Sequence, residues 1–326
     1  MKCVKVLKKN VQRFLEKFKT VVLNSYEFIK EGDFVFIPVS KCPKGYECLE
    51  RTFKQKPRKP KSLREALLKK GINAKGIISS FDLMGDIAVV EVPKGIDEKT
   101  VGEAIAEVHN VKGVYAKHSA VSGIYRVKKL KLIYGKEVKE VHYKENGVKM
   151  VFDPTKVFFS PRLAPERKRI SELVKEGENI LVLFAGVGPF ALVIAKKCKT
   201  CKIVGIELNP IAVKYFKKNV EINKFNNINV IEGDVKDVLK DFNNWADRVV
   251  MPLPKDAEHF LVYAGNACKK NGVIHFYTFV NRKKREEEVK EKLKNLKKKS
   301  KIRLIKHVRD YSKDIEQVVV DVEVVE

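Results

Sequence analysis

The sequence has no apolar run that approaches the roughly 18 residues needed to cross a membrane. Its first 14 residues are basic but lack the apolar centre of a secretory signal. Both absences argue against a membrane-spanning or secreted protein. We therefore expect a cytosolic protein.

Cysteine and histidine are also scarce, with six residues of each. Only Cys198 and Cys201 have the C-x-x-C spacing of a zinc site, and neither a second pair nor a nearby histidine completes four ligands. The sequence therefore predicts no metal site. We expect ordinary reduced thiols, with a disulfide as the alternative if the source is a hyperthermophile.

Acidic residues are few compared with basic ones. The chain has 41 Asp and Glu against 67 Lys and Arg, which gives a formal net charge of +26. A thermophile's charged surface would increase the numbers of both acidic and basic residues, whereas this excess is one-sided. A lysine-rich coding bias is another explanation that needs no binding partner. A soluble protein this basic usually has a polyanionic partner, and nucleic acid is the first candidate.

The length of 326 residues, with 44% apolar side chains, is enough for two or three domains with their own cores. We expect a small α/β module at residues 1–53, a basic, proline-bearing linker at 54–61, a middle domain at 62–152 and a further domain at 153–326. In the middle domain, lysines and arginines alternate with tyrosines in strand-like stretches. Such a sheet can stack bases and hold phosphates, although the tyrosines can equally fill a half-buried sheet.

From residue 153 onward, strand-like and helix-like stretches alternate. The central one is ILVLFAGVGPF at residues 180–190, whose apolar run is typical of a parallel strand covered on both faces. Gly186 and Gly188 let the backbone turn and approach a ligand, and Pro189 suits a first helical turn. The alternation predicts an α/β fold with a doubly wound, Rossmann-like parallel sheet that ends in an antiparallel edge.

Acidic residues and prolines follow the next strands. Residues 186–191 satisfy G-x-G-x-x-A, which nicotinamide, flavin and S-adenosylmethionine enzymes share. Glu207 ends the next strand, where an acid would hold ribose hydroxyls, and Asp234 ends the following one, where it would face an adenine. Pro252 and Pro254 make a rigid loop after the fourth strand. Together these features favour a methyltransferase that uses S-adenosylmethionine over a dehydrogenase.

The chain resembles the archaeal and eukaryal family of tRNA guanosine-37 N1-methyltransferases and their wyosine-pathway relatives. The resemblance is carried by FFSPR-x-x-x-ER at residues 158–167, FAGVGPF at 184–190, IELNP at 206–210, GIYR at 123–126 and HYKENG at 142–147. The motifs FFSPR-x-x-x-ER and HYKENG are specific, whereas the glycine-containing turn FAGVGPF is not. The resemblance extends over essentially the whole chain.

This resemblance implies that different parts of the chain bind different parts of a tRNA. The first module would dock on the outer corner of the L-shaped tRNA, and the rest would hold the anticodon loop and S-adenosylmethionine. The target would be N1 of guanosine 37, which must leave its stack. The family pattern makes Glu166 the base that removes the N1 proton and Arg126 the cation that stabilises charge on O6. From the residues alone, Glu166 could instead be a first-turn helix acid, and Arg126 could pair with a phosphate.

The glycine-containing turn at residues 186–188 and the family resemblance together give a set of expected cofactor-binding residues. For the two phenylalanines in this set, a place in the apolar core is the alternative. The set is Phe158, Arg167, Phe184, Gly186, Gly188, Glu207, Leu208, Asp234, Val235, Pro252 and Pro254.

Two positions depart from the family pattern. Many members have Asn where this chain has Pro252, and proline cannot supply the amide that Asn offers. Some members carry Asp where this chain has Val182. The loss of Asn resembles the subgroup that also methylates C7 of 4-demethylwyosine, so a second activity is an open expectation.

We therefore expect a monomeric tRNA methyltransferase that uses S-adenosylmethionine and acts on N1 of guanosine 37. Aminocarboxypropyl transfer from the same cofactor is the alternative within the family. A non-catalytic RNA-binding protein is the alternative from another class, and a nicotinamide oxidoreductase is the least favoured one.

Overall fold

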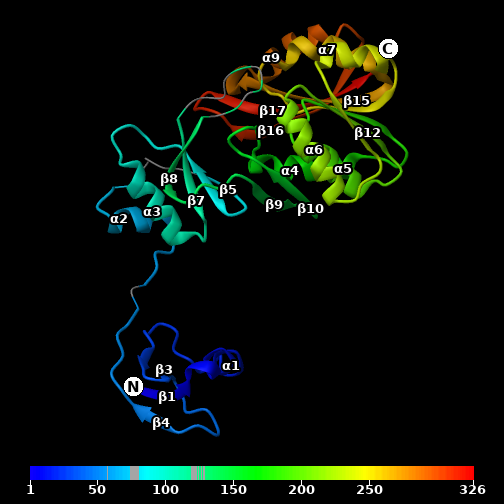
Figure 1. The fold of residues 1–326 in the computed structure, drawn as a ribbon. Helices are drawn as coiled ribbons and strands as arrows, with labels where there is room; N and C mark the ends of the chain where they lie inside the picture. The colour runs from blue at the N-terminus through cyan, green and yellow to red at the C-terminus, as the bar shows by residue number, and fades with distance from the viewer. Residues whose placement is uncertain (57, 74–80, 119–122, 124, 126, 128) are drawn as a thin grey trace. The chain divides into compact units, whose positions relative to one another are not determined.

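The computed structural model describes the chain except residues 57, 74–80, 119–122, 124, 126 and 128 (Figure 1). The chain forms two compact units, Met1–Ser62 and Leu63–Glu326. The second unit contains both the expected middle domain and the expected methyltransferase domain. The domain boundaries expected from the sequence therefore stay predictions.

The first unit is an antiparallel sheet of four strands with one short helix. The strand order is β2-β3-β1-β4. Helix α1, Val11–Lys17, buries Phe14 against Val4, Val6 and Ile37. The strands are β1 Lys2–Leu7, β2 Ile29–Glu31, β3 Phe34–Pro38 and β4 Cys48–Glu50.

The second unit begins with a sheet of order β5-β6-β7-β8. Two helices, α2 at Leu63–Lys69 and α3 at Glu98–Val108, share an apolar cluster with it. Asp97 caps α3, since its carboxylate accepts a hydrogen bond from the Thr100 amide at 2.8 Å. The strands are β5 Phe81–Met84, β6 Ile87–Val90, β7 Gly113–Lys117 and β8 Leu130–Gly135.

A seven-stranded sheet forms the rest of this unit, in the order β13-β12-β11-β14-β15-β17-β16. The first five strands of this order run parallel, and β17 and β16 pair antiparallel. The predicted doubly wound sheet with an antiparallel edge is confirmed, although β16 was not expected. The strands are β11 Asn179–Leu183, β12 Lys202–Glu207, β13 Ile228–Glu232, β14 Ala246–Met251, β15 Cys268–Asn281, β16 Ser300–Asp310 and β17 Ile315–Val324.

Helices cover both faces of this sheet (Figure 1). Along β11, Ile180 and Val182 pack into one core cluster, while Leu181 and Leu183 pack into another. This alternation explains why the strand is apolar throughout. On the first face lie α4 Ala164–Leu173, α5 Pro189–Lys197 and α6 Pro210–Ile222; on the second lie α7 Val235–Val238, α8 Leu261–Ala267 and α9 Arg285–Leu293.

The motif HYKENG forms a hairpin of two short strands. Strands β9, Val141–Glu145, and β10, Val148–Phe152, pair antiparallel. Asn146 and Gly147 join them with φ angles of 45° and 78°. Two successive positive φ values suit the tight turns of hairpins, which explains the Asn-Gly pair.

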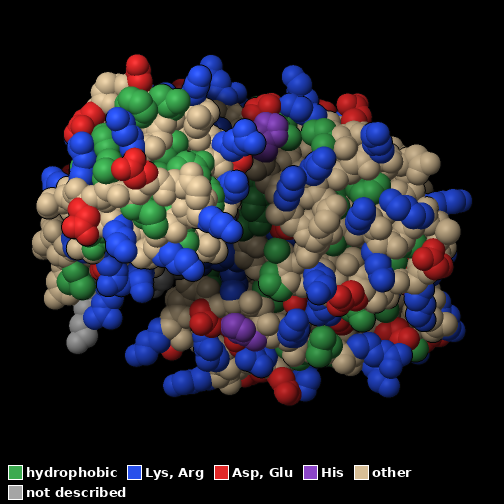
Figure 2. All heavy atoms as spheres, turned by 90° about the horizontal axis from the view of Figure 1, so that it is seen from below, with side chains coloured by type: hydrophobic (Ala, Val, Ile, Leu, Met, Phe, Trp, Pro, Cys, Tyr) green, Lys and Arg blue, Asp and Glu red, His purple; other side chains and the backbone are tan. Residues whose placement is uncertain are grey.

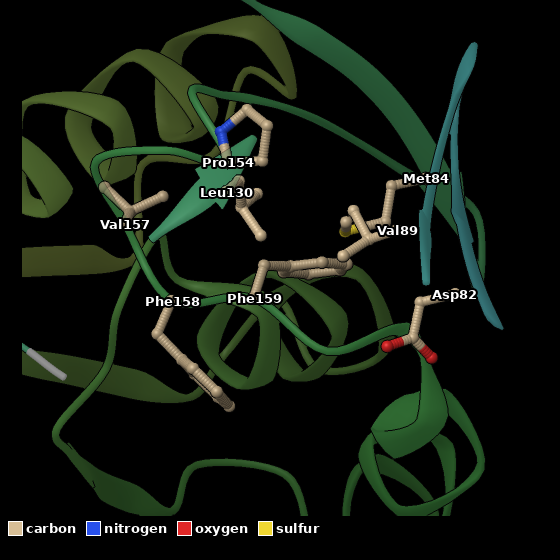
Figure 3. Close-up of a pocket in the computed structure, with 8 residues that line it drawn as sticks. All are labelled: Asp82, Met84, Val89, Leu130, Pro154, Val157, Phe158 and Phe159. Carbon is tan, nitrogen blue, oxygen red and sulfur yellow. The ribbon is translucent and has the colours of Figure 1, made fainter. Parts of the chain in front are cut away.

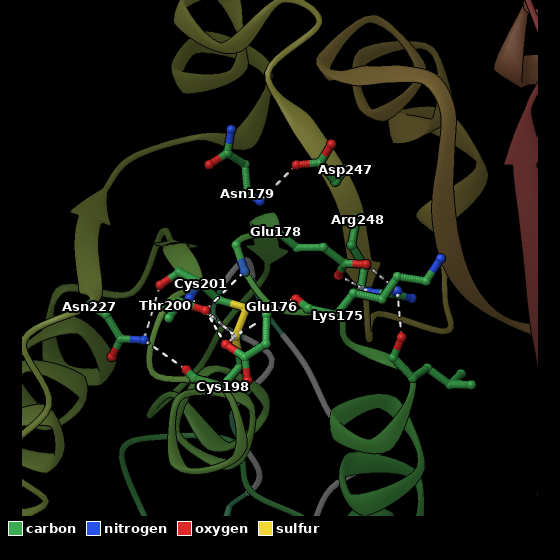
Figure 4. Close-up of a disulfide and its surroundings, with 12 residues drawn as sticks. Lys175, Glu176, Glu178, Asn179, Cys198, Thr200, Cys201, Asn227, Asp247 and Arg248 are labelled. Atoms are coloured by element: carbon green, nitrogen blue, oxygen red, sulfur yellow. Dashed lines mark hydrogen bonds and ion pairs between the residues drawn. A yellow bond between two sulfur atoms is a disulfide. The ribbon is translucent and has the colours of Figure 1, made fainter.

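Two disulfides show that the expectation of reduced thiols is wrong for four of the six cysteines. Cys42 is bonded to Cys48 in the first unit, and Cys198 to Cys201 at the turn between α5 and β12 (Figure 4). The turn brings the Cα atoms of Cys198 and Cys201 to 5.6 Å, within the usual range for a disulfide. Cys3 and Cys268 are free and buried.

Candidate active site

The strand β11 ends in a turn whose backbone is open on one side. Gly186 and Gly188 have φ angles of 58° and 90°. A Cβ on Gly188 would lie 2.1 Å from the Phe216 ring, so this glycine allows α6 to pack closely. A Cβ on Gly186 would meet only the Phe158 carbonyl, at 3.7 Å. Gly186 therefore leaves room for a ligand to approach the backbone.

Glu207, the last residue of β12, is hydrogen-bonded to this turn. Its Oε2 accepts from the Gly186 amide at 2.7 Å, and its Oε1 accepts from the Asn209 amide at 2.8 Å. Burial raises the pKa of Glu207, and the hydrogen bonds from Asn209 and Gly186 oppose that rise. Glu207 thus links the ends of β11 and β12, at the position expected for a ribose-binding acid. Its contact with the ribose stays a prediction.

Other expected cofactor residues follow the neighbouring strands. Asp234 comes after β13 and caps α7, because its Oδ1 accepts from the Lys236 amide at 2.8 Å. Val235 is buried beside it. Pro252 and Pro254 come directly after β14 and are half-buried. The expected residues of four strands therefore meet at the carboxyl edge of the parallel sheet, where such folds bind ligands.

Large apolar side chains stay exposed at this edge. Phe158 is 37% exposed, Leu208 38% and Ile211 40%. The Phe184 ring is half-buried and packs edge-on against Phe260, with 4.9 Å between ring centroids. Exposed apolar groups around an open backbone commonly mark a ligand site. The set fits an adenosine-type cofactor, with apolar surface for the base and a carboxylate for the hydroxyls.

Two neighbouring phenylalanines, Phe158 and Phe159, line a small cavity of about 20 Å³ (Figure 3). Phe159 points toward Met84 and Val89, and it is 9% exposed. The Phe158 side chain points in another direction, away from Met84 and Val89, and the Phe158 carbonyl lies beside Gly186. Phe159 is thus part of the core, whereas Phe158 is the ring that a ligand can reach.

Glu166 lies in the first turn of α4 and is 4% exposed. Its Oε2 accepts hydrogen bonds from Arg169 at 2.8 Å and from the Tyr277 hydroxyl at 3.1 Å, and its Oε1 accepts from Lys306 at 2.7 Å. Two of these donors, Arg169 and Lys306, are cationic and form ion pairs with the carboxylate. Burial and the charge of Glu166 raise the pKa of Tyr277 well above its usual value, so the phenol keeps its proton.

The position of Tyr277 places this carboxylate near the cofactor edge. Phe276 pairs with Met251, the last residue of β14, so Tyr277 lies level with Pro252. Glu166 is thus fixed close to the loop that follows the fourth strand. Sequence reasoning missed these partners, because Tyr277 and Lys306 lie 111 and 140 residues from Glu166 and no local pattern relates them.

A buried polar network continues from Arg169 into the sheet. Arg169 bonds both oxygens of Asp321, at 2.7 and 3.3 Å, Asp321 bonds His275 Nδ1 at 2.6 Å, and His275 Nε2 lies 2.7 Å from Arg248. Because Arg248 can only donate, Nε2 accepts, and the imidazole proton lies on Nδ1 facing Asp321. Burial lowers the pKa of His275, which keeps it neutral. Arg248 also binds both oxygens of Glu178, at 2.8 and 2.9 Å (Figure 4).

Arg167, an expected cofactor contact, is 1% exposed. It forms two hydrogen bonds to the Glu145 carboxylate and one to the Ser160 carbonyl at 3.1 Å. Its guanidinium also lies 5.2 Å from the Phe159 ring centroid. In this structure Arg167 fastens the β9–β10 hairpin to α4, and its contact with the cofactor stays a prediction.

Arg126, the expected partner of O6, lies outside the described residues, so its role stays a prediction. Within the described part of the chain, no three His, Cys, Asp or Glu side chains are placed to hold a metal ion. No helix there combines the length and apolar character that spanning a bilayer requires.

Comparison with known families gives two matches. The model of the TRM5/TYW2 methyltransferase domain matches residues 141–305, and that of the TYW2 N-terminal domain matches residues 63–138. Together these matches extend over most of the second unit.

Three curated relatives act on position 37 of tRNA, according to their names. The tRNA (guanine(37)-N(1))-methyltransferase Trm5b of Pyrococcus abyssi is 40% identical, over 78% of this chain and 77% of that protein. The tRNA (guanine(37)-N(1))/4-demethylwyosine(37)-methyltransferase Taw22 of Nanoarchaeum equitans is 35% identical, over 65% and 88%. The tRNA(Phe) (4-demethylwyosine(37)-C(7)) aminocarboxypropyltransferase of Methanocaldococcus jannaschii is 32% identical, over 74% and 96%.

Solved structures are similar over three quarters of the chain or more. The complex of aTrm5 and tRNALeu has a TM-score of 0.76 and 30% identity, and the match covers 99% of both chains. The M. jannaschii TYW2 in complex with AdoMet has a TM-score of 0.59 and 27% identity, over 76% of this chain and 100% of that chain.

Proposed function

This chain belongs to the TRM5/TYW2 methyltransferase family, and from that premise we propose that it transfers a methyl group from S-adenosylmethionine to N1 of guanosine 37 in tRNA. The observation that carries the proposal is Glu166, a buried carboxylate that accepts hydrogen bonds from three donors, one of which, Tyr277, lies level with the loop after the fourth parallel strand. A buried, fixed carboxylate is what removal of the N1 proton requires.

S-adenosylmethionine, when bound, supplies an electrophilic methyl group on a sulfonium. We assign the ribose hydroxyls to Glu207, the adenine to Asp234 and the open backbone approach to Gly186. Phe158 and Leu208 offer the exposed apolar surface beside them.

Guanine N1 carries a proton and is a poor nucleophile, so Glu166 takes that proton as the methyl group transfers. Lys306 is the donor whose side chain reaches solvent, at 44% exposed, while the Glu166 side chain is buried. Withdrawal of Lys306 would free Oε1 to accept the proton, while Arg169 and Tyr277 keep Oε2 in place. Arg126 remains assigned to the charge that develops on O6.

We further propose C7 methylation of 4-demethylwyosine as a second activity. Pro252 stands where many family members carry Asn and offers no side-chain amide. The relative Taw22 carries both activities in its name. The alternative is aminocarboxypropyl transfer, the activity in the name of another relative of similar identity.

The charge of the protein bears on its partner. The net charge of +26, with Lys and Arg spread over the visible face in Figure 2, supports binding to tRNA. We propose that the protein reads the anticodon loop, that it acts as a monomer and that it works in the cytoplasm, where tRNA is modified.

The test is incubation with labelled S-adenosylmethionine and unmodified tRNA, followed by nucleoside mass analysis. N1-methylguanosine at position 37 is the expected product, and its absence would overturn the main proposal. The mass of an aminocarboxypropyl group would select the alternative reaction. With tRNA that carries 4-demethylwyosine, absence of a new methyl group would refute the second activity.

A further inference from the structure

The outward face of the β9–β10 hairpin has no role in the chemistry proposed above. The inward face is accounted for, because Val141, Val148 and Met150 pack in the core and Glu145 binds Arg167. The outward face carries the exposed side chains of His142, Lys144 and Lys149.

Lys144 and Lys149 lie directly opposite each other on the two strands. Like charges in directly opposed positions destabilise an antiparallel pair. Neither lysine forms an ion pair within the described part of the chain. The pair therefore opposes hairpin stability and leaves two positive charges without a carboxylate partner, so a bound anion would relieve their repulsion.

Helix α6 holds this part of the hairpin firmly. Asn223 accepts from the Lys149 amide at 2.9 Å and donates to the Lys149 carbonyl at 2.6 Å. Asn219 accepts from the Val151 amide at 2.7 Å. The backbone that carries Lys149 is thus fixed before any partner binds.

A groove of about 710 Å³ lies between this hairpin, α6 and the turn that joins β5 to β6. His142, Lys144, Lys149 and Lys218 are among its lining residues, and no acidic side chain is among the described residues that line it. Lys218 is held by both oxygens of Glu140, at 3.0 Å each. The groove is therefore basic along the hairpin wall.

Apolar side chains lie beside these cations. Leu83 is 38% exposed and Ile222 37% exposed, and both line the groove. Cations next to exposed apolar surface suit a polymer that alternates phosphates with less polar sugars and bases.

We propose that this groove binds backbone phosphates of the substrate tRNA, away from the nucleotide that is methylated. The identity of the RNA rests on the proposed function. Lys218 lies eight residues along α6 from Pro210, which is about 12 Å at the helical rise. The groove is thus separate from the cofactor corner, yet close enough to hold another part of the same RNA.

The test replaces Lys144 and Lys149 together by Gln. The matched control replaces Lys270 and Lys297, which are also exposed, carry the same charge and do not line the groove. Affinity for full-length tRNA is measured over a series of salt concentrations. We expect the groove variant to bind roughly tenfold more weakly and to lower the slope of log K against log salt by about two. Equal slopes in the two variants would overturn the proposal.

A second variant separates binding from folding. Lys149→Glu places a carboxylate opposite Lys144, so we expect a higher Tm than wild type together with weaker tRNA binding. Wild-type affinity in this more stable variant would overturn the proposal.

Turnover separates this inference from the proposed function. For the double Gln variant we expect kcat within about twofold of wild type at saturating tRNA and a raised KM. A fall in kcat at unchanged KM would overturn the binding role. If wild type makes no N1-methylguanosine, the proposed function fails, and the salt series still decides whether the groove binds tRNA.

Discussion

At the scale of single residues, Glu166 has to meet two opposing requirements. Three donors fix its carboxylate, but one of them, Lys306, also occupies Oε1, the oxygen that would accept the N1 proton. The conflict is resolved if the exposed donor, Lys306, leaves while Arg169 and Tyr277 stay. Arg169 and Tyr277 would then set the position of the carboxylate, and withdrawal of Lys306 would open Oε1 for the proton.

Glu166→Gln tests the role of this carboxylate. The amide keeps the shape of the side chain but cannot take a proton, so we expect single-turnover methylation to slow by about 10²- to 10⁴-fold. Affinities for tRNA and S-adenosylmethionine should stay near wild type in equilibrium binding. Glu172→Gln on the same helix, 58% exposed, is the control and should change neither. Parallel loss of rate and affinity would instead assign Glu166 a structural role.

Asp321 is the carboxylate on which the buried network depends. Burial alone would raise the pKa of Asp321, but hydrogen bonds from His275 and Arg169 lower it to about 2. A lowered folded-state pKa adds stability above the ordinary value of about 3.9, and that stability is lost as pH falls toward 2. The shift corresponds to roughly 2–3 kcal/mol.

Asp321→Asn should therefore lower the free energy of unfolding at pH 7 by at least this amount, since it also leaves Arg169 without its partner. It should also flatten the pH dependence of stability between about pH 4 and 2. Urea unfolding at a series of pH values measures both effects. A variant with the wild-type slope over this window would show that other groups control acid stability.

At the scale of elements, the turn from β11 into α5 contains two glycines with different tasks. Gly188→Ala combines a φ of 90° with a Cβ that would overlap the Phe216 ring, so we expect a loss of roughly 2–4 kcal/mol. Gly186→Ala has a φ of 58° and open space, so we expect a loss of about 1 kcal/mol but weaker cofactor binding. Urea unfolding and calorimetric titration with S-adenosylmethionine measure the two effects, and the reverse ranking of stabilities would contradict these assignments.

The parallel strands could be predicted from sequence because each is a short apolar run with both faces covered. β16 could not, because its apolar residues do not alternate. Register shifts at Ile302/Leu304 and His307/Arg309 break the two-residue period. Ile302, Ile305 and Val308 instead pack inward at intervals of three, a spacing typical of a helix.

The candidate site also contains some features that could be predicted from the sequence and others that could not. The acid that ends β12 and the one that follows β13 come at the ends of apolar strands, so their place at the carboxyl edge could be predicted. The contacts of Glu166 could not, since Lys306 comes from the unexpected strand. The reduced state expected for Cys198 was wrong because composition carries no information on how closely a turn brings two thiols together.

At the scale of the whole molecule, the first unit carries a large share of the charge. Residues 1–62 contain 16 Lys and Arg but 6 Asp and Glu. The family resemblance implies that the small module within this unit, at residues 1–53, docks on the outer corner of tRNA. The second unit has core clusters of its own, so we expect it to fold without the first.

Deletion of Met1–Ser62 should therefore weaken binding of full-length tRNA and leave binding of an isolated anticodon stem-loop almost unchanged. The comparison of the two dissociation constants, for the full chain and the truncated one, is the measurement. If both RNAs lose affinity equally, the docking role of the first unit is wrong.

The outer strand of the large sheet also bears on behaviour in concentrated solution. β16 is 11 residues long and carries Lys301, Arg303, Lys306 and His307. Its shifted register and repeated cations mean that the same strand of a second molecule could not pair with it without opposing like charges. Growth of one sheet onto another, the first step toward fibrils, is therefore blocked at this edge. A protein that meets its RNA through positive charge is protected by that same charge from self-assembly when no RNA is bound.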